Sequence, residues 1–201
     1  MIYLVRHGET ESNAAGVVQW PSAELSARGR EQARRLGERF AGLSVARVLA
    51  SDYARAQATA QPVLRATGAE LCSEPLLRER HFGALRGRSY AELRAEGIAP
   101  FGEDYAPPGG ESWPQFRARV ARAWRRALNF AAETPGDLAI ITHGMVCAVL
   151  LERHAPPAPN ASGSAPPWRN TGVSILEGPP WRATLFNCTA HLPQPTDSAP
   201  V

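Results

Sequence analysis

The strongest constraint on the fold is a pattern of three short apolar runs, each ending in a turn that carries arginine or histidine. The runs are Met1–Val5, Ala46–Ala50 and Leu138–Ile141. Short runs without polar alternation favour strands that are buried on both faces, as in a parallel sheet. Helical patterns separate the runs, and helices are the usual crossovers between parallel strands. The sequence therefore predicts an α/β fold with a doubly wound, mostly parallel sheet.

Two longer helices are predicted from capping signals and residue spacing. The range Ser26–Gly42 has apolar residues at helical spacing opposite a charged face, with glycine past its end. A second helix begins after Ser112, where a Ser-x-x-Gln capping pattern and an early proline occur, and runs to about residue 132. Its apolar stripe, expected in the core, consists of Phe116, Val120, Trp124, Ala127 and Ala131.

The carboxyl-terminal part of the chain is predicted to add an antiparallel edge. Val173–Glu177 and Arg182–Asn187 have the composition of strands, and the Gly-Pro-Pro-Trp sequence between them indicates a hairpin turn. The stretch Ala155–Pro167, rich in proline, alanine and serine, is expected to be a surface loop. The expected architecture is a three-layer αβα sandwich formed by one domain over residues 1–192, with residues 193–201 as a disordered tail.

The residues that follow the first run indicate phosphate chemistry. Arg6 and His7 end the run and Gly8 stops it, so both side chains lie where open α/β sheets bind ligands. A guanidinium can bind two phosphate oxygens at once, and a neutral imidazole can attack phosphorus and carry the phosphoryl group. In isolation, so short a motif fits equally well a surface arginine beside a hydrogen-bonded loop histidine.

Three further residues occupy comparable places. Arg55 follows the second run near the first turn of a predicted helix, and the third run ends in Thr142-His143-Gly144 before another apolar helix. Between them in sequence, Glu79 lies in a loop rich in arginine. These residues extend the short motif at His7 into a possible catalytic group.

With these motifs in order, the chain resembles the histidine phosphatase superfamily, the group that includes cofactor-dependent phosphoglycerate mutases. The resemblance covers most of the chain, and several spaced motifs in a fixed order are far more specific than one. It implies a phosphoglycerate mutase-like fold. The matching motifs are Arg6-His7-Gly8-Glu9-Thr10, Asn13, Gln19, Leu25-Ser26 to Gln32-Ala33, Ser51 to Ala60, Glu79, Gly110-Glu111-Ser112 and Thr142-His143-Gly144.

The resemblance implies a role for each matching residue. His7 would be the nucleophile that becomes a phosphohistidine, and Glu79 would be the proton donor. Arg6, Arg55 and His143 would surround the transferred phosphoryl group. The remaining substrate-binding positions that the resemblance implies are Asn13, Gln19 and Gly144.

The chemistry sets conditions on two of these groups. His7 must be neutral at its attacking nitrogen, which a hydrogen bond from the other ring nitrogen to a backbone carbonyl would enforce. Glu79 must be protonated before it can donate to a leaving alkoxide, which requires a raised pKa. The sequence contains no lysine, which excludes a Walker-type phosphate loop and a Schiff-base mechanism.

Composition narrows the other classes of function. The 201 residues include 44% hydrophobic and 20% charged residues, as in a globular domain. The net charge is +3 and the arginines are not interleaved with aromatic residues, so nucleic-acid binding is not expected. No run is long enough for a membrane span or a secretory signal, and a cytoplasmic location is expected. Cys72, Cys147 and Cys188 lack metal-ligand spacing, as do the five histidines, so neither a metal nor another cofactor is expected.

The acceptor of the phosphoryl group is the remaining question. Hydrolysis is favoured because the mutases carry a tyrosine and a lysine where this chain has Phe82 and Tyr90, and because a shorter segment between Glu79 and His143 gives water better access. A mutase is the alternative, and a non-catalytic phosphate-binding protein is a third. Aromatic residues that could form an apolar rim for the leaving group, or equally pack in the core, are Trp20, Phe82, Trp113 and Trp168.

The expected partner is a small phosphorylated metabolite. Sugar phosphates, phosphoglycerate, phosphoserine and α-ribazole phosphate are all open as substrates. The sequence carries no signal for an oligomeric state, and a homodimer is expected only because dimers are the commonest assembly.

Overall fold

The computed structural model describes residues 1–164 and 167–193. Within these residues the strands are β1 (Ile2–Arg6), β2 (Val45–Ala50), β3 (Glu70–Ser73), β4 (Asp137–Thr142), β5 (Pro157–Gly163), β6 (Val173–Glu177) and β7 (Arg182–Cys188). The helices are α1 (Glu11–Ala14), α2 (Ala27–Phe40), α3 (Ala54–Thr67), α4 (Tyr90–Ala95), α5 (Trp113–Glu133) and α6 (Gly144–Arg153), with short 3-10 helices η1 (Pro75–Leu77) and η2 (Gly83–Leu85).

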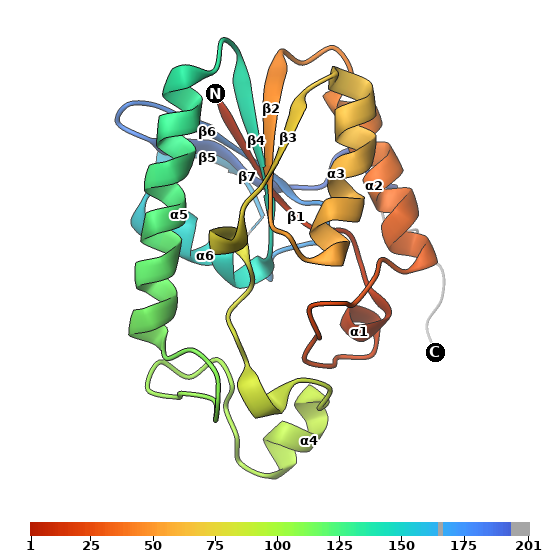
Figure 1. The fold of residues 1–201 in the computed structure, drawn as a ribbon, viewed down its shortest axis with the longest axis vertical. Helices are drawn as coiled ribbons and strands as arrows, with labels where there is room; N and C mark the ends of the chain where they lie inside the picture. The colour runs from red at the N-terminus through yellow and green to blue at the C-terminus, as the bar shows by residue number, and fades with distance from the viewer. Residues whose placement is uncertain (165–166, 194–201) are drawn as a thin grey trace.

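The strands form one sheet in the order β3-β2-β4-β1-β6-β7-β5. β1, β2, β3 and β4 are parallel to one another, whereas β6 is antiparallel to both β1 and β7. Arg6 at the end of β1 lies opposite Thr142 at the end of β4, so the two following segments leave the sheet side by side. Figure 1 shows that the carboxyl ends of these strands point toward α1 and α4. Ligands of open α/β sheets bind at this edge.

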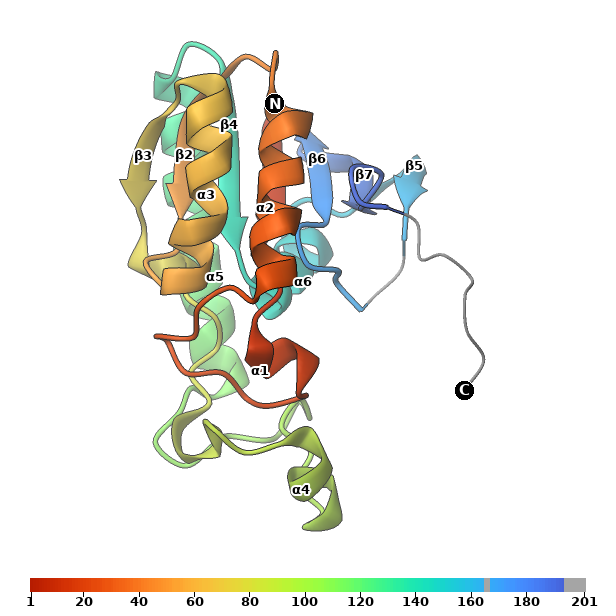
Figure 2. The ribbon, with the colours of Figure 1, turned by 90° about the vertical axis from the view of Figure 1, so that its right-hand side faces the viewer.

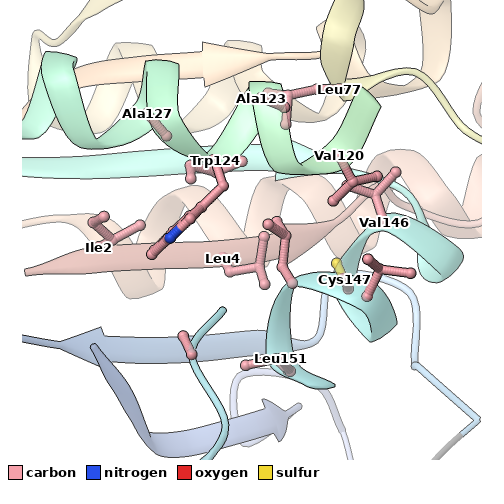
Figure 3. Packing of buried hydrophobic residues seen from close by; sticks show 14 of the residues in the cluster. Ile2, Leu4, Leu77, Val120, Ala123, Trp124, Ala127, Val146, Cys147 and Leu151 are labelled. Carbon is pink, nitrogen blue, oxygen red and sulfur yellow. The ribbon is translucent and has the colours of Figure 1, made fainter. Parts of the chain in front are cut away.

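Alternating side chains of β1 connect the sheet to both helical layers. Ile2 and Leu4 are buried in a cluster with α5 and α6, while Tyr3 and Val5 are buried in a second cluster with α2 and α3. Figure 2 shows α2 and α3 in front of the sheet, and Figure 3 shows the packing against α5 and α6 on its other face. The predicted three-layer αβα architecture is confirmed.

A third cluster anchors the segment that follows Glu79, residues 80–111, which we call the α4 segment. In Figure 1 this segment lies beyond the carboxyl ends of the parallel strands. Arg80 holds it together, because its buried guanidinium donates to the backbone carbonyls of Pro100, Tyr105 and Glu111. The buried members of the cluster are Val18, Phe82, Leu85 and Leu93.

The predicted helices and hairpin are present, with one correction. The helix expected at Ser26–Gly42 is α2, and Ser112 caps α5 through the expected capping box with Gln115. The expectation of a loop at Ala155–Pro167 is wrong for residues 157–163, which form β5 and pair in parallel with β7. β5 is an edge strand, where prolines are tolerated, so its composition resembles that of a loop.

Two further expectations concern the ends of the chain and membranes. Residues 194–201 of the tail expected to be disordered lie outside the residues that the structure describes. Among the described helices, none is long and apolar enough to cross a membrane.

Candidate active site

His7 lies directly after β1, and its ring is held in one orientation. Nδ1 is 2.7 Å from the carbonyl oxygen of Gly8, which can only accept a hydrogen bond, so Nδ1 carries the proton and Nε2 does not. Arg55 donates from Nε to this Nε2 at 3.2 Å. Burial, with the charges of Arg55 and Arg6, lowers the pKa of His7 well below its usual value. The hydrogen bond expected of a neutral, nucleophilic histidine is therefore present.

Arg55 is the second residue of α3, just past the carboxyl end of β2, and its side chain is buried. Its Nη1 donates to the carbonyl of Trp20 at 3.0 Å. Burial lowers the pKa of Arg55 to about 10, but this value is still high enough for the guanidinium to be charged at neutral pH. Thr59 connects this helix to the nucleophile, since its Oγ1 accepts from the N–H of Gly8 at 2.9 Å and donates to the carbonyl of Arg55 at 2.6 Å.

Arg6 and His143 complete the basic groups around His7. Arg6 donates from Nη1 to the carbonyl of Trp168, and its buried Nε has no partner among the described residues. His143 is fully buried, with its ring centroid 5.1 Å from that of His7. Its Nε2 lies 2.9 Å from Oγ of Ser51, while Nδ1 is also without a partner in the described part of the chain. Two buried nitrogens beside His7 are thus unsatisfied, which is unusual in a folded protein.

Glu79 faces the same site from the loop between η1 and η2. Its Oε2 accepts from the N–H of Met145 in the first turn of α6 at 3.1 Å, and its Oε1 accepts from the N–H of Arg80 at 3.0 Å. Burial raises the pKa of Glu79, although these bonds and the charges of Arg55 and Arg6 oppose the rise. A carboxyl group with a raised pKa can hold a proton and release it during a reaction.

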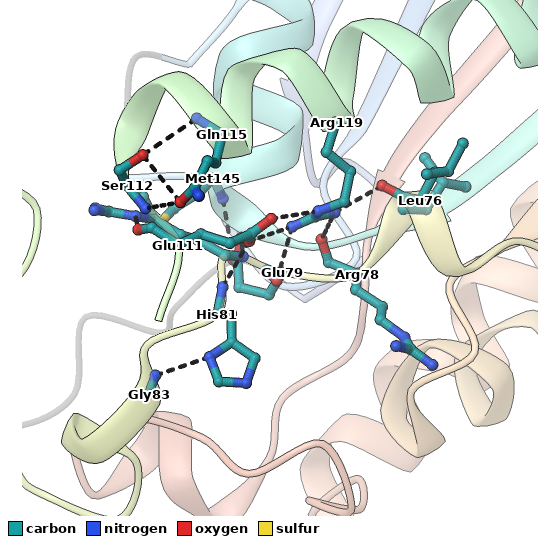
Figure 4. Close-up of polar contacts among 12 residues, drawn as sticks. Leu76, Arg78, Glu79, His81, Gly83, Glu111, Ser112, Gln115, Arg119 and Met145 are labelled. Atoms are coloured by element: carbon teal, nitrogen blue, oxygen red, sulfur yellow. Dashed lines mark hydrogen bonds and ion pairs between the residues drawn. The ribbon is translucent and has the colours of Figure 1, made fainter. Parts of the chain in front are cut away.

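The loop that carries Glu79 is clamped from α5 by Arg119, as Figure 4 shows. Arg119 donates to the backbone carbonyls of Leu76 and Arg78 at 2.7 Å each, and to that of Glu79 at 3.2 Å. It also donates two hydrogen bonds of 2.7 Å to the carboxylate of Glu111. One guanidinium therefore supports the backbone that presents the carboxyl group of Glu79.

A cavity of about 540 Å³ joins these groups, which is large enough for a phosphate ester with a sizeable organic part. Arg6, His7, Arg55 and Glu79 line it, and so do Asn13, Gln19 and Gly144. His143 does not line it, and the side chain of Trp20 is exposed to solvent. The aromatic residues in the wall are Tyr53, Phe82, Tyr90, Phe101, Trp113 and Trp168.

The other features of the described residues that could bear on catalysis are metal-ligating groups, the cysteines and a second cavity. The described residues contain no group of three or more His, Cys, Asp or Glu side chains that could hold a metal ion. Cys147 is buried, Cys72 and Cys188 are partly buried, and all three are free. A second cavity of about 680 Å³ borders the Glu79 loop from the α5 side, but His7 does not line it.

Comparison with known proteins decides the family. The family model of the histidine phosphatase superfamily (branch 1) matches residues 2–189. The chain belongs to this superfamily. Among curated relatives, "Probable phosphoglycerate mutase GpmB" of Erwinia tasmaniensis is 35% identical over 159 residues, which cover 75% of this chain and 72% of that protein. "Phosphoglycerate mutase-like protein 4" of Arabidopsis thaliana is 32% identical over 205 residues, or 95% and 86% of the two chains.

A solved structure gives a second kind of likeness within the histidine phosphatase superfamily. The mycobacterial glucosyl-3-phosphoglycerate phosphatase is 25% identical, with a TM-score of 0.76 over 90% of this chain and 95% of that one. The names of the relatives thus include mutases and a phosphatase. They support the superfamily but do not choose between the two reactions.

Two further residues contact the site of this superfamily member without belonging to the predicted set. The ring of Tyr53 meets that of His143 edge-on, with centroids 5.3 Å apart, and lies 5.0 Å from the guanidinium carbon of Arg55. Asn170 donates to the carbonyl of His7 at 3.0 Å from a loop far along the chain. The position of Tyr53, three residues after the run that ends at Ala50, was an available signal, whereas no sequence pattern marks Asn170.

Proposed function

We propose that the protein is a metal-independent phosphomonoesterase that hydrolyses small-molecule phosphate esters through a phosphohistidine on His7. The observation that carries the proposal is the state of the His7 ring. Nδ1 donates to the carbonyl of Gly8 at 2.7 Å, and the unprotonated Nε2 lies 3.2 Å from Nε of Arg55 in the wall of the cavity. A neutral imidazole held in this way is a nucleophile that needs no separate base.

In the first half-reaction, Nε2 of His7 forms a bond to phosphorus while the bond from phosphorus to the ester oxygen breaks. Glu79 is protonated at the start and transfers its proton to the departing oxygen, so the alcohol leaves as a neutral molecule. The raised pKa of Glu79 supports this role, because burial keeps the carboxyl group protonated at a higher pH than in free glutamate.

In the second half-reaction, a water molecule attacks phosphorus and the bond from phosphorus to Nε2 breaks. Glu79, now ionised, accepts a proton from the attacking water. Inorganic phosphate leaves, and His7 and Glu79 return to their starting protonation states. A single carboxyl group therefore serves as acid in one step and base in the next.

The basic groups around His7 support charge stabilisation on the phosphoryl group. Arg6 and Arg55 supply two guanidinium groups in the cavity wall. The unsatisfied Nε of Arg6 is consistent with a further hydrogen bond to a phosphoryl oxygen, whereas His143 does not line the cavity. Each such preorganised donor is typically worth about 10²–10³ in rate.

The rest of the cavity supports a leaving group with an apolar or aromatic body. Phe82 and Tyr90 line it at the positions where the mutases carry a tyrosine and a lysine, so the polar contacts to a sugar acid are lost or changed. Trp113 and Trp168 extend the apolar wall. For this reason we favour hydrolysis over transfer to a second hydroxyl group, with a small phosphorylated metabolite as the substrate.

The phosphoenzyme is the first test. The protein is mixed with an aryl phosphate carrying radiolabelled phosphorus, and both labelled protein and free phosphate are measured. We expect an acid-labile label on His7 and release of phosphate to water, while His7→Ala loses label and turnover but keeps its fold. His81→Asn is the matched control, because His81 does not line the cavity of about 540 Å³ around His7, which we call the main cavity.

The other outcomes decide between the alternatives. Transfer of the label to a second hydroxyl group would identify a mutase, and absence of label and turnover would leave a phosphate-binding protein. Substantial turnover by His7→Ala would refute the phosphohistidine mechanism.

The proton donor is tested by Glu79→Gln. We expect kcat on alkyl phosphates to fall by about 10²–10⁴, because their leaving groups need a proton. Aryl phosphates with acidic leaving groups should be affected much less. Equal losses on the two ester classes would remove Glu79 from the acid role.

A further inference from the structure

Four arginines line the main cavity, and the proposed reaction uses two of them. Its charged lining residues within the described chain are Arg6, Arg55, Arg80, Arg86 and Glu79. Arg6 and Arg55 would balance the two negative charges of a phosphate monoester. The guanidinium of Arg80 is almost fully buried and donates to three backbone carbonyls. With Glu79 protonated, the charge of Arg86 has no counterpart.

Arg86 also has little to bind within the protein. It follows η2 in the α4 segment, and its guanidinium meets only one side chain of the described residues, the hydroxyl of Tyr53 at 3.4 Å. That distance is at the long limit of a hydrogen bond. Asp52 lines an adjoining groove together with Arg86, but its carboxylate accepts hydrogen bonds of 2.5, 2.8 and 3.1 Å from Arg78. Among the residues that the structure describes, Arg86 is therefore a half-buried cation without an ion pair.

The charge of Arg86 is felt by its neighbours. Burial is the main cause of the lowered pKa values of Arg55 and His81, and the positive charge of Arg86 lowers both further. Cations that repel one another at a partly buried site are stabilised when an anion lies beside them. Arg86 also lines the groove beside Asp52, which neither Arg6 nor His7 borders, so it lies at the rim of the main cavity.

We infer that Arg86 binds a carboxylate on the leaving group, so that preferred substrates are phosphate monoesters of an aromatic alcohol that carries a carboxylate. The inference rests on the proposed function, which assigns the phosphoryl end of the substrate to His7. A carboxylate fits better than a second phosphate, because its single charge matches that of Arg86 and its two oxygens match the guanidinium fork. The aromatic body would lie against Phe82 and Phe101, whose rings meet edge-on at 5.8 Å in the same wall.

Binding of non-hydrolysable phosphonates tests the inference without turnover. Phenylphosphonate is compared by calorimetry with its meta- and para-carboxy derivatives. For the wild-type protein we expect at least one carboxylated ligand to bind about tenfold more tightly than phenylphosphonate. This factor is the lower end of the range for a hydrogen bond to a charged group, because Arg86 is half-exposed. Arg86→Gln should lose this preference and keep its affinity for phenylphosphonate.

Arg88→Gln is the matched control. It removes the same charge two positions later in the α4 segment, but Arg88 is paired with Glu96 and does not line the main cavity. This variant should keep the preference for the carboxylated ligand. A thermal unfolding measurement on both variants checks that the α4 segment remains folded.

The remaining results separate the inference from the proposed function. Equal binding of the ligands by the wild-type protein would overturn the inference. So would an equal loss for all ligands in Arg86→Gln, which would show that Arg86 contacts the phosphoryl group instead. Hydrolysis of the corresponding phosphates is measured in parallel, and its absence would refute the proposed function while the phosphonates still decide the role of Arg86.

Discussion

Replacing Arg119 by methionine tests how far Glu79, the proposed proton donor, depends on the hydrogen bonds that Arg119 of α5 makes to its loop. The guanidinium makes three hydrogen bonds to loop carbonyls and two to Glu111, and methionine keeps an apolar stem while removing all of them. Breaking a fully buried ion pair costs about 3–5 kcal/mol. Here the two side chains are 13% and 21% exposed, so water can replace part of the loss. We expect the free energy of unfolding to fall by about 2 kcal/mol, which for this chain length lowers the thermal midpoint by about 4–8 °C.

The catalytic effect of Arg119→Met should depend on the leaving group. A displacement of about 1 Å at a catalytic group can cost about 10² in rate. Only esters whose alcohol needs a proton from Glu79 should show that loss, so kcat on an alkyl phosphate should fall about a hundredfold and kcat on an activated aryl phosphate should change little. Arg119→Lys should recover part of the alkyl activity, because an ammonium group can still donate to the loop carbonyls.

Arg122→Met is the control for this experiment. Arg122 lies three residues later on α5, is exposed, and lines the second cavity without a side-chain partner among the described residues. We expect that variant to keep both its stability and its activity. Equal losses on alkyl and aryl phosphates in Arg119→Met would contradict the reasoning. So would unchanged alkyl turnover despite the lower stability.

Three further predictions follow from burial and packing. The lowered pKa of His7 and the raised pKa of Glu79 predict a bell-shaped dependence of kcat/KM on pH, whose falling limb should disappear in Glu79→Gln; a limb that persists belongs to another group. Burial also lowers the pKa of His143, so below about pH 6.5 the unfolded chain binds more protons at His7 and His143 than the native protein does. As the pH falls below this value, the free energy of unfolding should therefore decrease by up to about 1.4 kcal/mol per pH unit for each of these two histidines. Urea unfolding at pH 7 and 5.5 measures this, and a flat profile would refute it. Gly29→Ala should lower stability by about 1–3 kcal/mol despite the helix propensity of alanine, because its Cβ would overlap the carbonyl of Glu9; an unchanged thermal midpoint would contradict this.

The residues that we propose contact the phosphoryl group could be predicted to lie together because they follow strands. Arg6 and Thr142 are paired across β1 and β4, which brings His7 and His143 together once the two apolar runs are recognised as parallel neighbours. Arg55 reaches the same point at the start of α3, after β2. The apolar runs and the residues at their ends therefore predict which residues far apart in the sequence lie together in the fold. The expected homodimer and cytoplasmic location have no such signal and stay predictions.

The leaving-group half could be predicted only in part. The aromatic candidates Phe82, Trp113 and Trp168 line the cavity, but Phe101 and Arg86 come from a segment without periodicity and were not expected there. Phe101 and Arg86 reach the cavity through the fold of the α4 segment, which depends on the contacts of buried Arg80 with three carbonyls rather than on an apolar pattern. This division has a functional consequence. In the proposed function the residues at the strand ends bind the phosphoryl group and the α4 segment forms part of the wall around the leaving group, so changes in that segment could alter substrate preference on one fold. Exchange of the α4 segment, rather than of any strand end, is the change expected to alter which alcohol this protein accepts.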